Sequence, residues 1–341
     1  MGLFSFFTKE IAIDLGTANT FIIHNDKVIV DQPSIVAINR NTGKLEAVGE
    51  RAMLMEGKAP DDIKVIRPLR DGVIADFQAA ELMIIEFLNM LNQKQKILLP
   101  PSLRMVVCIP SGITEVEERA VRDSAEQAGA KEIRLLHDPM AAAIGIGLNV
   151  LEPTGNMVVD IGGGTSEIAV IALGGIISNK SIKTAGDEFN ADIMDYMRKE
   201  HNLAIGLRTA ELIKINVGAA LSDIDDIPPL YEVRGSDIIT GIPKAVMISH
   251  QEIAVALDAS ISQIEVAIMN ALERTPPELS ADIFKTGIYL AGGGALLRGL
   301  DKRINLKTKL PVHVADDPLK AVARGTAIAL KNFYGFTFLK K

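Results

Sequence analysis

Cysteine, long apolar runs and basic clusters are all scarce in this chain of 341 residues. The single cysteine, Cys108, excludes an internal disulfide framework, which fits a reducing compartment such as the cytoplasm. It lies in an apolar run that ends at Pro110, so we expect a buried strand thiol. No apolar stretch approaches the ~20 residues that a membrane span requires, and we expect no signal peptide ahead of the first strand.

The charge balance also disfavours one class of partner, the nucleic acids. The net charge is −7 and no long basic run occurs, which disfavours binding to a nucleic-acid backbone. Hydrophobic residues make up 48% of the chain, enough for a globular core. The length favours roughly two domains.

Two segments are apolar where a surface is usually polar. They contain Leu3, Phe4, Phe6 and Phe7 near the N-terminus, and Ile97, Leu98 and Leu99 in an expected loop. Burying four such side chains in lipid contributes up to roughly 6–12 kcal/mol, much of which is offset by the cost of ordering the chain. We therefore expect peripheral membrane contact. The alternatives are that Phe6 and Phe7 begin the first strand, and that the loop buries against a neighbour.

The most informative feature is a pair of similar hairpins about half a chain apart. The first runs from Ile11 through Asp14 and Gly16 into a second apolar run, and the other repeats this order around Asp160 and Gly162. An apolar run, a glycine-rich polar turn and another apolar run predict strand, turn, strand. Glycine lets backbone N–H groups converge on a phosphate, and a carboxylate beside the turn can hold Mg²⁺. Two such hairpins indicate a duplicated domain that grips one nucleotide from both sides.

The rest of the chain alternates strands and helices, which predicts an α/β fold with sheets flanked by helices. Thr114 and Glu117 have capping-box spacing and open a helix that runs to Ala128. Asp138 as N-cap and Pro139 at the first helical position open an Ala-rich helix. Further helices are expected over residues 78–95, 189–200, 208–221 and 249–273. A late strand leads into a triple-glycine turn at residues 292–294 and a helix start.

The ordered motifs resemble those of the actin-like ATPase superfamily, and within it the MreB family of bacterial actins. The segments that carry the resemblance are residues 13–19, 110–117, 160–165 and 292–297. The resemblance covers nearly the whole chain. It implies two duplicated lobes with two smaller inserted subdomains. Their expected bounds are 1–31, 76–147 and 315–341 for subdomain IA; 32–75 for IB; 148–183 and 249–314 for IIA; and 184–248 for IIB.

The resemblance also implies ATP and Mg²⁺ as cofactors, and it assigns the site residues. The phosphate-binding residues would be Gly16, Thr17, Ala18, Asn19, Gly162, Gly163 and Gly164. Asp14 and Asp160 would orient Mg²⁺ and its waters, whereas either Asp alone could cap a turn. Glu211 and Lys214 would contact the ribose or adenine edge, although their spacing also suits a solvated helix face. Gly292, Gly293 and Gly294 would let the backbone pass close to the adenosine.

Asp138 stands where MreB-type sequences usually carry Glu. The family role of that position is to orient the water that attacks the γ-phosphate, because phosphoryl transfer needs positioning and electrostatics more than covalent chemistry. Asp is one methylene shorter than Glu, so we expect hydrolysis that is slow and dependent on assembly. His137 could assist, but a lone histidine beside a strand is more often structural.

The family resemblance further implies head-to-tail filaments that pair into antiparallel doublets on the inner face of the cytoplasmic membrane. It implies wall-synthesis partners such as RodZ, MreC and MreD, and control of cell shape. A DnaK-type chaperone would need a peptide-binding domain after the ATPase lobes, and a sugar or acetate kinase would need an acceptor site. The open alternatives are a DNA-segregating actin and a filament-forming paralogue with little or no ATP hydrolysis.

Overall fold

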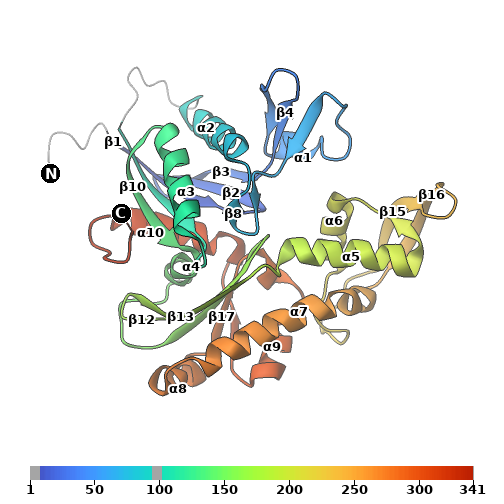
Figure 1. Cartoon of the computed structure of the whole chain (residues 1–341). Helices are drawn as coiled ribbons and strands as arrows, with labels where there is room; N and C mark the ends of the chain where they lie inside the picture. The colour runs from blue at the N-terminus through green and yellow to red at the C-terminus, as the bar shows by residue number, and fades with distance from the viewer. Residues whose placement is uncertain (1–7, 94–101, 341) are drawn as a thin grey trace. The chain divides into compact units, whose positions relative to one another are not determined.

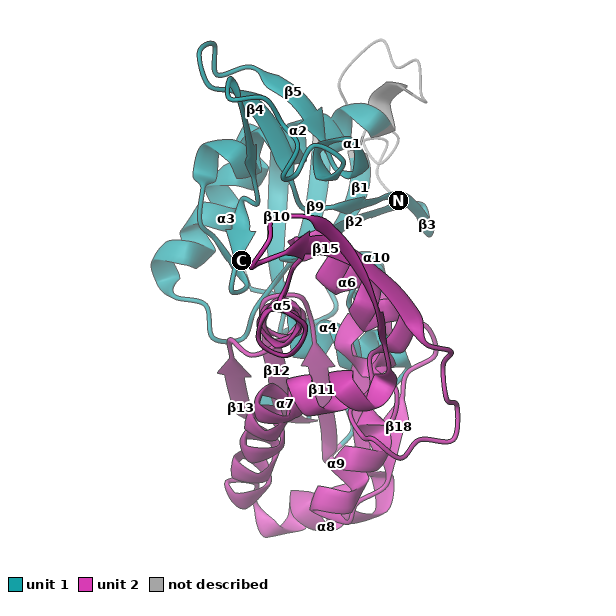
Figure 2. Ribbon diagram, turned by 90° about the vertical axis from the view of Figure 1, so that its right-hand side faces the viewer, with its two compact units in different colours: residues 1–152, 173–176, 320–341 teal, residues 153–172, 177–319 magenta. Residues whose placement is uncertain are grey.

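The computed structural model describes residues 8–93 and 102–340, and the chain divides into two compact units (Figure 2). Unit 1 comprises Met1–Glu152, Leu173–Ile176 and Lys320–Lys341. Unit 2 comprises Pro153–Ala172 and Ile177–Leu319.

Unit 1 is built on a five-stranded sheet with the order β10-β9-β1-β2-β3 (Figure 1). Strand β1 (Thr8–Leu15) pairs antiparallel with β2 (Asn19–His24), which pairs antiparallel with β3 (Lys27–Pro33). On its other side β1 runs parallel to β9 (Ser102–Ile109), and β9 runs parallel to β10 (Ala130–His137). The carboxyl ends of β1, β9 and β10 therefore lie at one edge of the sheet.

The two faces of this sheet are covered by different helices. Ile11 and Ile13 on one face share a buried cluster with Met83 of α2 (Phe77–Gln93) and Val121 of α3 (Glu115–Gln127). The opposite face carries Cys108, which is 3% exposed. Its Sγ lies 2.8 Å from the hydroxyl of Thr326 on α10 (Ala321–Lys331). The prediction of a buried strand thiol is confirmed.

Helices α4 (Asp138–Ile146) and α10 cross each other unusually closely. A Cβ atom added at Gly145 would lie 1.8 Å from the carbonyl oxygen of Ala321. One added at Gly325 would lie 1.8 Å from the carbonyl oxygen of Ala141. The two backbones touch only because both positions lack a side chain.

The smaller elements of unit 1 lie between β3 and α2 in the chain. A three-stranded sheet has the order β5-β4-β6, and β7 pairs with β8. Their bounds are β4 (Val36–Asn39), β5 (Leu45–Val48), α1 (Glu50–Met53), β6 (Ile63–Ile66), β7 (Leu69–Arg70) and β8 (Val73–Ile74).

Unit 2 repeats the five-stranded plan with the order β13-β12-β11-β17-β18. Strand β11 (Asn156–Ile161) pairs antiparallel with β12 (Ser166–Ala172) and parallel with β17 (Ile288–Ala291). Strand β17 runs parallel to β18 (Val312–Val314), and β13 (Gly175–Ile182) forms the other edge. The first hairpin strand is thus central in both units, and the predicted duplication of an α/β core is confirmed.

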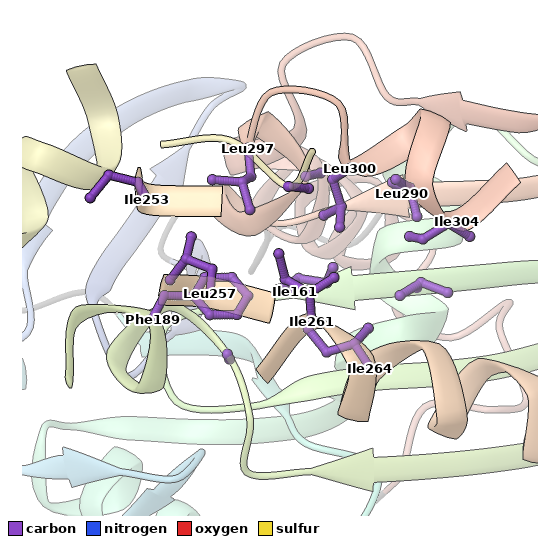
Figure 3. Packing of buried hydrophobic residues seen from close by; sticks show 14 of the residues in the cluster. Ile161, Phe189, Ile253, Leu257, Ile261, Ile264, Leu290, Leu297, Leu300 and Ile304 are labelled. Atoms are coloured by element: carbon purple, nitrogen blue, oxygen red, sulfur yellow. The ribbon is translucent and has the colours of Figure 1, made fainter. Parts of the chain in front are cut away.

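The helices of unit 2 bury one face of its sheet. Ile161 of β11 belongs to a buried cluster with Phe189 of α5, Leu257 and Ile261 of α7, and Leu300 of α9 (Figure 3). The remaining bounds are α5 (Gly186–His201), β14 (Leu203–Ala204), α6 (Leu207–Val217), β15 (Tyr231–Asp237), β16 (Pro243–Ile248), α7 (His250–Glu273), α8 (Pro277–Thr286), η2 (Gly293–Leu296), α9 (Leu300–Thr308) and η3 (Pro318–Lys320).

Several expected helix ends are confirmed and others are corrected. Thr114 forms the predicted capping box with Glu117. The N-cap of α4 is His137 rather than Asp138, which moves Asp138 into the first turn and Pro139 one position further in. Helix α6 ends at Val217, about four residues before its expected end, and Gly218 is its C-cap. The triple-glycine turn leads into a short 3-10 turn, and the α-helix that follows begins later, at Leu300.

Candidate functional site

The glycine turn of unit 1 follows the carboxyl end of β1 and is fixed by contacts from a later loop. A Cβ at Gly16 would lie 2.6 Å from the carbonyl oxygen of Asn19, so only glycine fits this turn. Ser34 donates its hydroxyl to the carbonyl of Gly16 (2.6 Å) and its backbone N–H to the carbonyl of Ala18 (2.8 Å). Thr17 is 7% exposed, and its Oγ1 accepts a hydrogen bond from the N–H of Gly72 (3.0 Å).

Asp14 lies at the carboxyl end of β1, where it is only partly exposed. The protein around it removes solvent from the carboxyl group and raises the pKa of Asp14 to about 7. An acid whose charge is so poorly solvated gains from a nearby cation.

Asp138 follows β10 and lies at the same sheet edge as Asp14. Strand β10 pairs with β9 up to the pair of His137 and Ile109, and β9 in turn runs parallel to β1. Burial lowers the pKa of His137 below its usual value, and the positive charge of Lys340 adds to this shift. The lowered pKa favours the neutral imidazole, and Nδ1 of His137 lies 3.4 Å from the carbonyl oxygen of Pro110.

The glycine turn of unit 2 is held by the start of α5. The N–H of Gly186 donates to the carbonyl of Gly162 (3.1 Å), and the N–H of Asp187 donates to the carbonyl of Gly163 (2.7 Å). The turn itself closes with a hydrogen bond from the N–H of Gly162 to the carbonyl of Thr165 (2.9 Å). These hydrogen bonds fix the backbone of the turn against the start of α5.

Glu211 and Lys214 of α6 lie next to the start of α5, which holds this glycine turn. Lys214 donates from Nζ to the carbonyl of Gly186 (2.9 Å) and to Oε2 of Glu211 (2.8 Å). Asn190 of α5 donates from Nδ2 to that same oxygen of Glu211 (2.7 Å). The predicted pair is thus joined to the glycine turn through Gly186, the first residue of α5, while the side chain of Glu211 is 44% exposed.

The triple-glycine turn lies against the end of β11. Gly292 has φ +77°, and a Cβ there would lie 2.5 Å from Oδ1 of Asp160 and 2.3 Å from the carbonyl oxygen of Ile161. A Cβ at Gly294 would lie 2.2 Å from the side chain of Ile161. Parallel pairing of β11 with β17 explains this, since Asp160 is opposite Ala291. Gly293 begins the 3-10 turn.

Within each unit, the structure brings the predicted residues to the carboxyl edge of the parallel strands, which is where α/β sheets bind their ligands. The residues expected to contact the membrane lie outside the described residues: Leu3, Phe4, Phe6, Phe7, Ile97, Leu98 and Leu99.

In residues 8–93 and 102–340, no three His, Cys, Asp or Glu side chains lie close enough together to hold a metal ion by themselves. None of the helices in these same segments is both long and apolar enough to cross a bilayer. A cavity of about 190 Å³ lies elsewhere in unit 1, lined in part by Arg40, Lys64 and Gln78.

Sequence reasoning missed the residues that support the turns: Ser34, Gly72, Gly186 and Asn190. The helix expected over residues 189–200 begins earlier, at Gly186, so this residue was not expected to contact the glycine turn. The support of Thr17 by Gly72 spans 55 positions, and no local pattern marks such a contact.

Comparison with known proteins gives a consistent result. The family model described as MreB/Mbl protein matches residues 8–337. The cell shape-determining protein Mbl of Bacillus subtilis is 46% identical over 96% of this chain and 97% of its own length. The cell shape-determining protein MreB of Escherichia coli K12 is 45% identical over 95% of this chain and 94% of its own.

Solved structures of MreB5 and MamK have the same fold as this chain. MreB5 of Spiroplasma citri bound to ADP superposes with a TM-score of 0.90 at 37% identity, covering 96% of this chain and 97% of that one. A MamK chain from a double helical filament superposes with a TM-score of 0.77 at 20% identity over 95% and 99% of the two chains, which shows the shared fold. The fold is therefore actin-like, and the chain belongs to the MreB/Mbl family.

Proposed function

We propose that this chain is an ATP-binding bacterial actin that polymerises on the inner face of the cytoplasmic membrane and organises cell-wall synthesis to set cell shape. The observation that carries the proposal is the pair of glycine turns, each at the carboxyl edge of its sheet. Two further findings support it. The related Spiroplasma citri MreB5 has been solved bound to ADP and to AMPPNP, and the relatives are named for cell-shape determination.

The residues fit the nucleotide and its ion. A Cβ at Gly16, Gly292 or Gly294 would collide with neighbouring protein atoms, so these turns depend on glycine. Residues 16–19 and 162–164 would bind the phosphates, and Gly292–Gly294 and the pair of Glu211 and Lys214 the adenosine. Asp14 and Asp160 would hold Mg²⁺ through its waters, as is usual for an ion that keeps much of its hydration shell.

Asp138 is the proposed water-positioning residue of a slow ATPase. Its place in the first turn of α4, rather than at the N-cap, still leaves it at the sheet edge that carries Asp14. The family position usually carries Glu, so the shorter Asp138 side chain makes turnover slow. A filament-forming paralogue with little or no hydrolysis is the second candidate, favoured by the same residue.

Nucleotide binding and assembly are linked in this proposal. A ligand that contacts both halves of a four-subdomain actin favours the closed form, and head-to-tail contacts between copies give an open filament. Each subunit would bind lipid weakly through residues 3–7 and 97–99, and the filament tightly through many copies. RodZ, MreC and MreD are the proposed wall-synthesis partners.

The test is sedimentation of the purified protein with ATP, ADP or no nucleotide, with and without anionic liposomes, while phosphate release is followed. We expect nucleotide-dependent pelleting that liposomes enhance, with slow phosphate release. Gly16→Val should abolish all three responses, whereas Gly206→Ala, where nothing lies within 4 Å of the added Cβ, should leave them intact. A wild-type protein that stays in solution while releasing phosphate would contradict the filament proposal. Growth that needs a DNA adaptor and ignores liposomes would favour a DNA-segregating actin.

A further inference from the structure

Asn190 of α5 is a polar side chain buried in unit 2, where it contacts Glu211 of α6. It is 2% exposed, and its Nδ2 donates to Oε2 of Glu211 at 2.7 Å. Because only the amide nitrogen can donate to a carboxylate, this contact fixes which way the amide points. The amide oxygen of Asn190 is then buried, and it accepts no hydrogen bond within residues 8–93 and 102–340.

The unpaired oxygen of Asn190 disfavours folding. A buried acceptor without a donor loses its hydration and gains no hydrogen bond in return, and such groups are few in folded proteins. An apolar side chain of similar size would fill the same space without this loss. The amide of Asn190 is therefore better explained by its effect on Glu211 than by its packing.

The carboxylate of Glu211 is held by one of its two oxygens. Lys214 donates from Nζ to Oε2 at 2.8 Å, so both donors meet at this oxygen. Within the described segments, no residue donates to Oε1. The side chain of Glu211 is 44% exposed. A carboxylate fixed in this way has its second oxygen available to accept a hydrogen bond from a ligand.

The place of this carboxylate indicates which part of a nucleotide it meets. Asn190 and Gly186 are four residues apart on α5, so they lie on one face of the helix. The N–H of Gly186 donates to the carbonyl of Gly162 in the glycine turn proposed to bind phosphate. In a nucleotide the ribose joins the phosphates to the base, so the group beside the phosphates is the sugar, and its hydroxyls are hydrogen-bond donors.

We infer that Asn190 is a positioning residue that gives the site a preference for ribonucleotides over deoxyribonucleotides. It holds Glu211 so that Oε1 accepts a hydrogen bond from a ribose hydroxyl of the bound nucleotide. The inference rests on the proposed function, because it needs a nucleotide at the glycine turn of unit 2, and it adds to that function the recognition of the sugar.

The test compares the affinities of the full-length protein for ADP, 2′-deoxy-ADP and 3′-deoxy-ADP, measured by calorimetry with Mg²⁺. The wild-type protein should bind ADP roughly tenfold or more tightly than at least one deoxy analogue, as expected for a hydrogen bond to a charged group. Asn190→Leu has a similar size and removes the donor. It should weaken the binding of ADP toward that of this analogue, and leave the affinity for the analogue nearly unchanged.

Three companion variants separate positioning from packing. Asn190→Asp keeps the shape of the side chain but replaces the donor with an acceptor, so it should lose the same preference. Glu211→Ala should abolish the preference, and adding Asn190→Leu to it should cause no further loss, because the two residues act through one hydrogen bond. Asn216→Leu is the matched control on α6, since Asn216 donates from Nδ2 to the carbonyl of Leu212 (2.7 Å), and it should keep the wild-type preference.

The possible results are distinct. Equal binding of ADP and both deoxy analogues by the wild-type protein would overturn the inference and leave nucleotide binding intact. Equal weakening of all three ligands in both Asn190 variants would overturn it in favour of a packing role, and an unchanged preference in both would overturn it as well. Absence of ADP binding in the wild-type protein would overturn both the inference and the proposed function.

Discussion

Asp14 shows how one residue can set stability and function against each other. Its pKa is about 7 in the folded chain against 3.8 for the ordinary side chain. The folded state therefore holds this proton more tightly than the unfolded state, and the free energy of unfolding falls as the pH rises through that interval. The ionised form of Asp14 is the one that would hold Mg²⁺. Without the ion, the same ionised form lowers the free energy of unfolding.

Replacing Asp14 should therefore change the stability of the protein in a pH-dependent way. We expect Asp14→Asn, in EDTA and without nucleotide, to stabilise the protein at about pH 8 by on the order of 1–3 kcal/mol and to have little effect at about pH 4. Melting temperatures recorded across this pH range provide the measurement. A stability difference that stays constant with pH would contradict the assignment. The same variant should bind nucleotide–magnesium poorly.

Asp138 gives a second prediction at this scale. Restoring the longer side chain in Asp138→Glu should raise the rate of phosphate release severalfold, because the carboxylate then reaches the attacking water directly. Asp138→Asn should lower that rate, while both variants keep the wild-type affinity for ADP, since positioning a water is separate from binding the nucleotide. Phosphate release under saturating ATP tests this. Equal rates in all three proteins would remove Asp138 from the mechanism.

At the scale of elements, the crossing of α4 and α10 brings two helix backbones into direct contact. The Cβ of Gly145→Ala would meet the carbonyl oxygen of Ala321 at 1.8 Å, so the helices must separate. We expect a loss of roughly 1–3 kcal/mol or more, as for overpacked cores, measured by chemical denaturation. Gly206→Ala, whose added Cβ meets nothing within 4 Å, is the control. Equal stability of the two variants would contradict the observed crossing.

Elements also show what local sequence can predict. The capping box at Thr114 was readable because its partner lies three residues away; the same spacing at Ser249 and Glu252 forms a second box that was not predicted. Both hairpins were readable from apolar runs interrupted by glycine. The start of α4 was misplaced by one residue, because Asp138 and His137 can each precede a helical proline. The hydrogen bond from Ser34 to the carbonyl of Gly16 joins residues that only the fold brings together, so no local sequence pattern indicates it.

At the scale of the whole molecule, the two segments expected to touch lipid are attached at neighbouring points. Residue 8, which follows the first segment, pairs with residue 102, which follows the second. Deleting residues 2–7 should therefore strongly reduce sedimentation with liposomes while leaving nucleotide-dependent polymerisation unchanged. Leu98→Asp with Leu99→Asp should have a smaller effect in the same direction. Unchanged sedimentation in both variants would argue against membrane contact.

The buried thiol of β9 has a practical consequence. Cys108 is 3% exposed and packed against Thr326, so labelling reagents should reach it slowly in the native protein. A cysteine introduced on the surface would then be the fast-reacting thiol, and Cys108 the slow one. Fluorophores, spin labels and cross-linkers can therefore be attached one site at a time without first rebuilding the core, so that contacts between copies can be mapped directly.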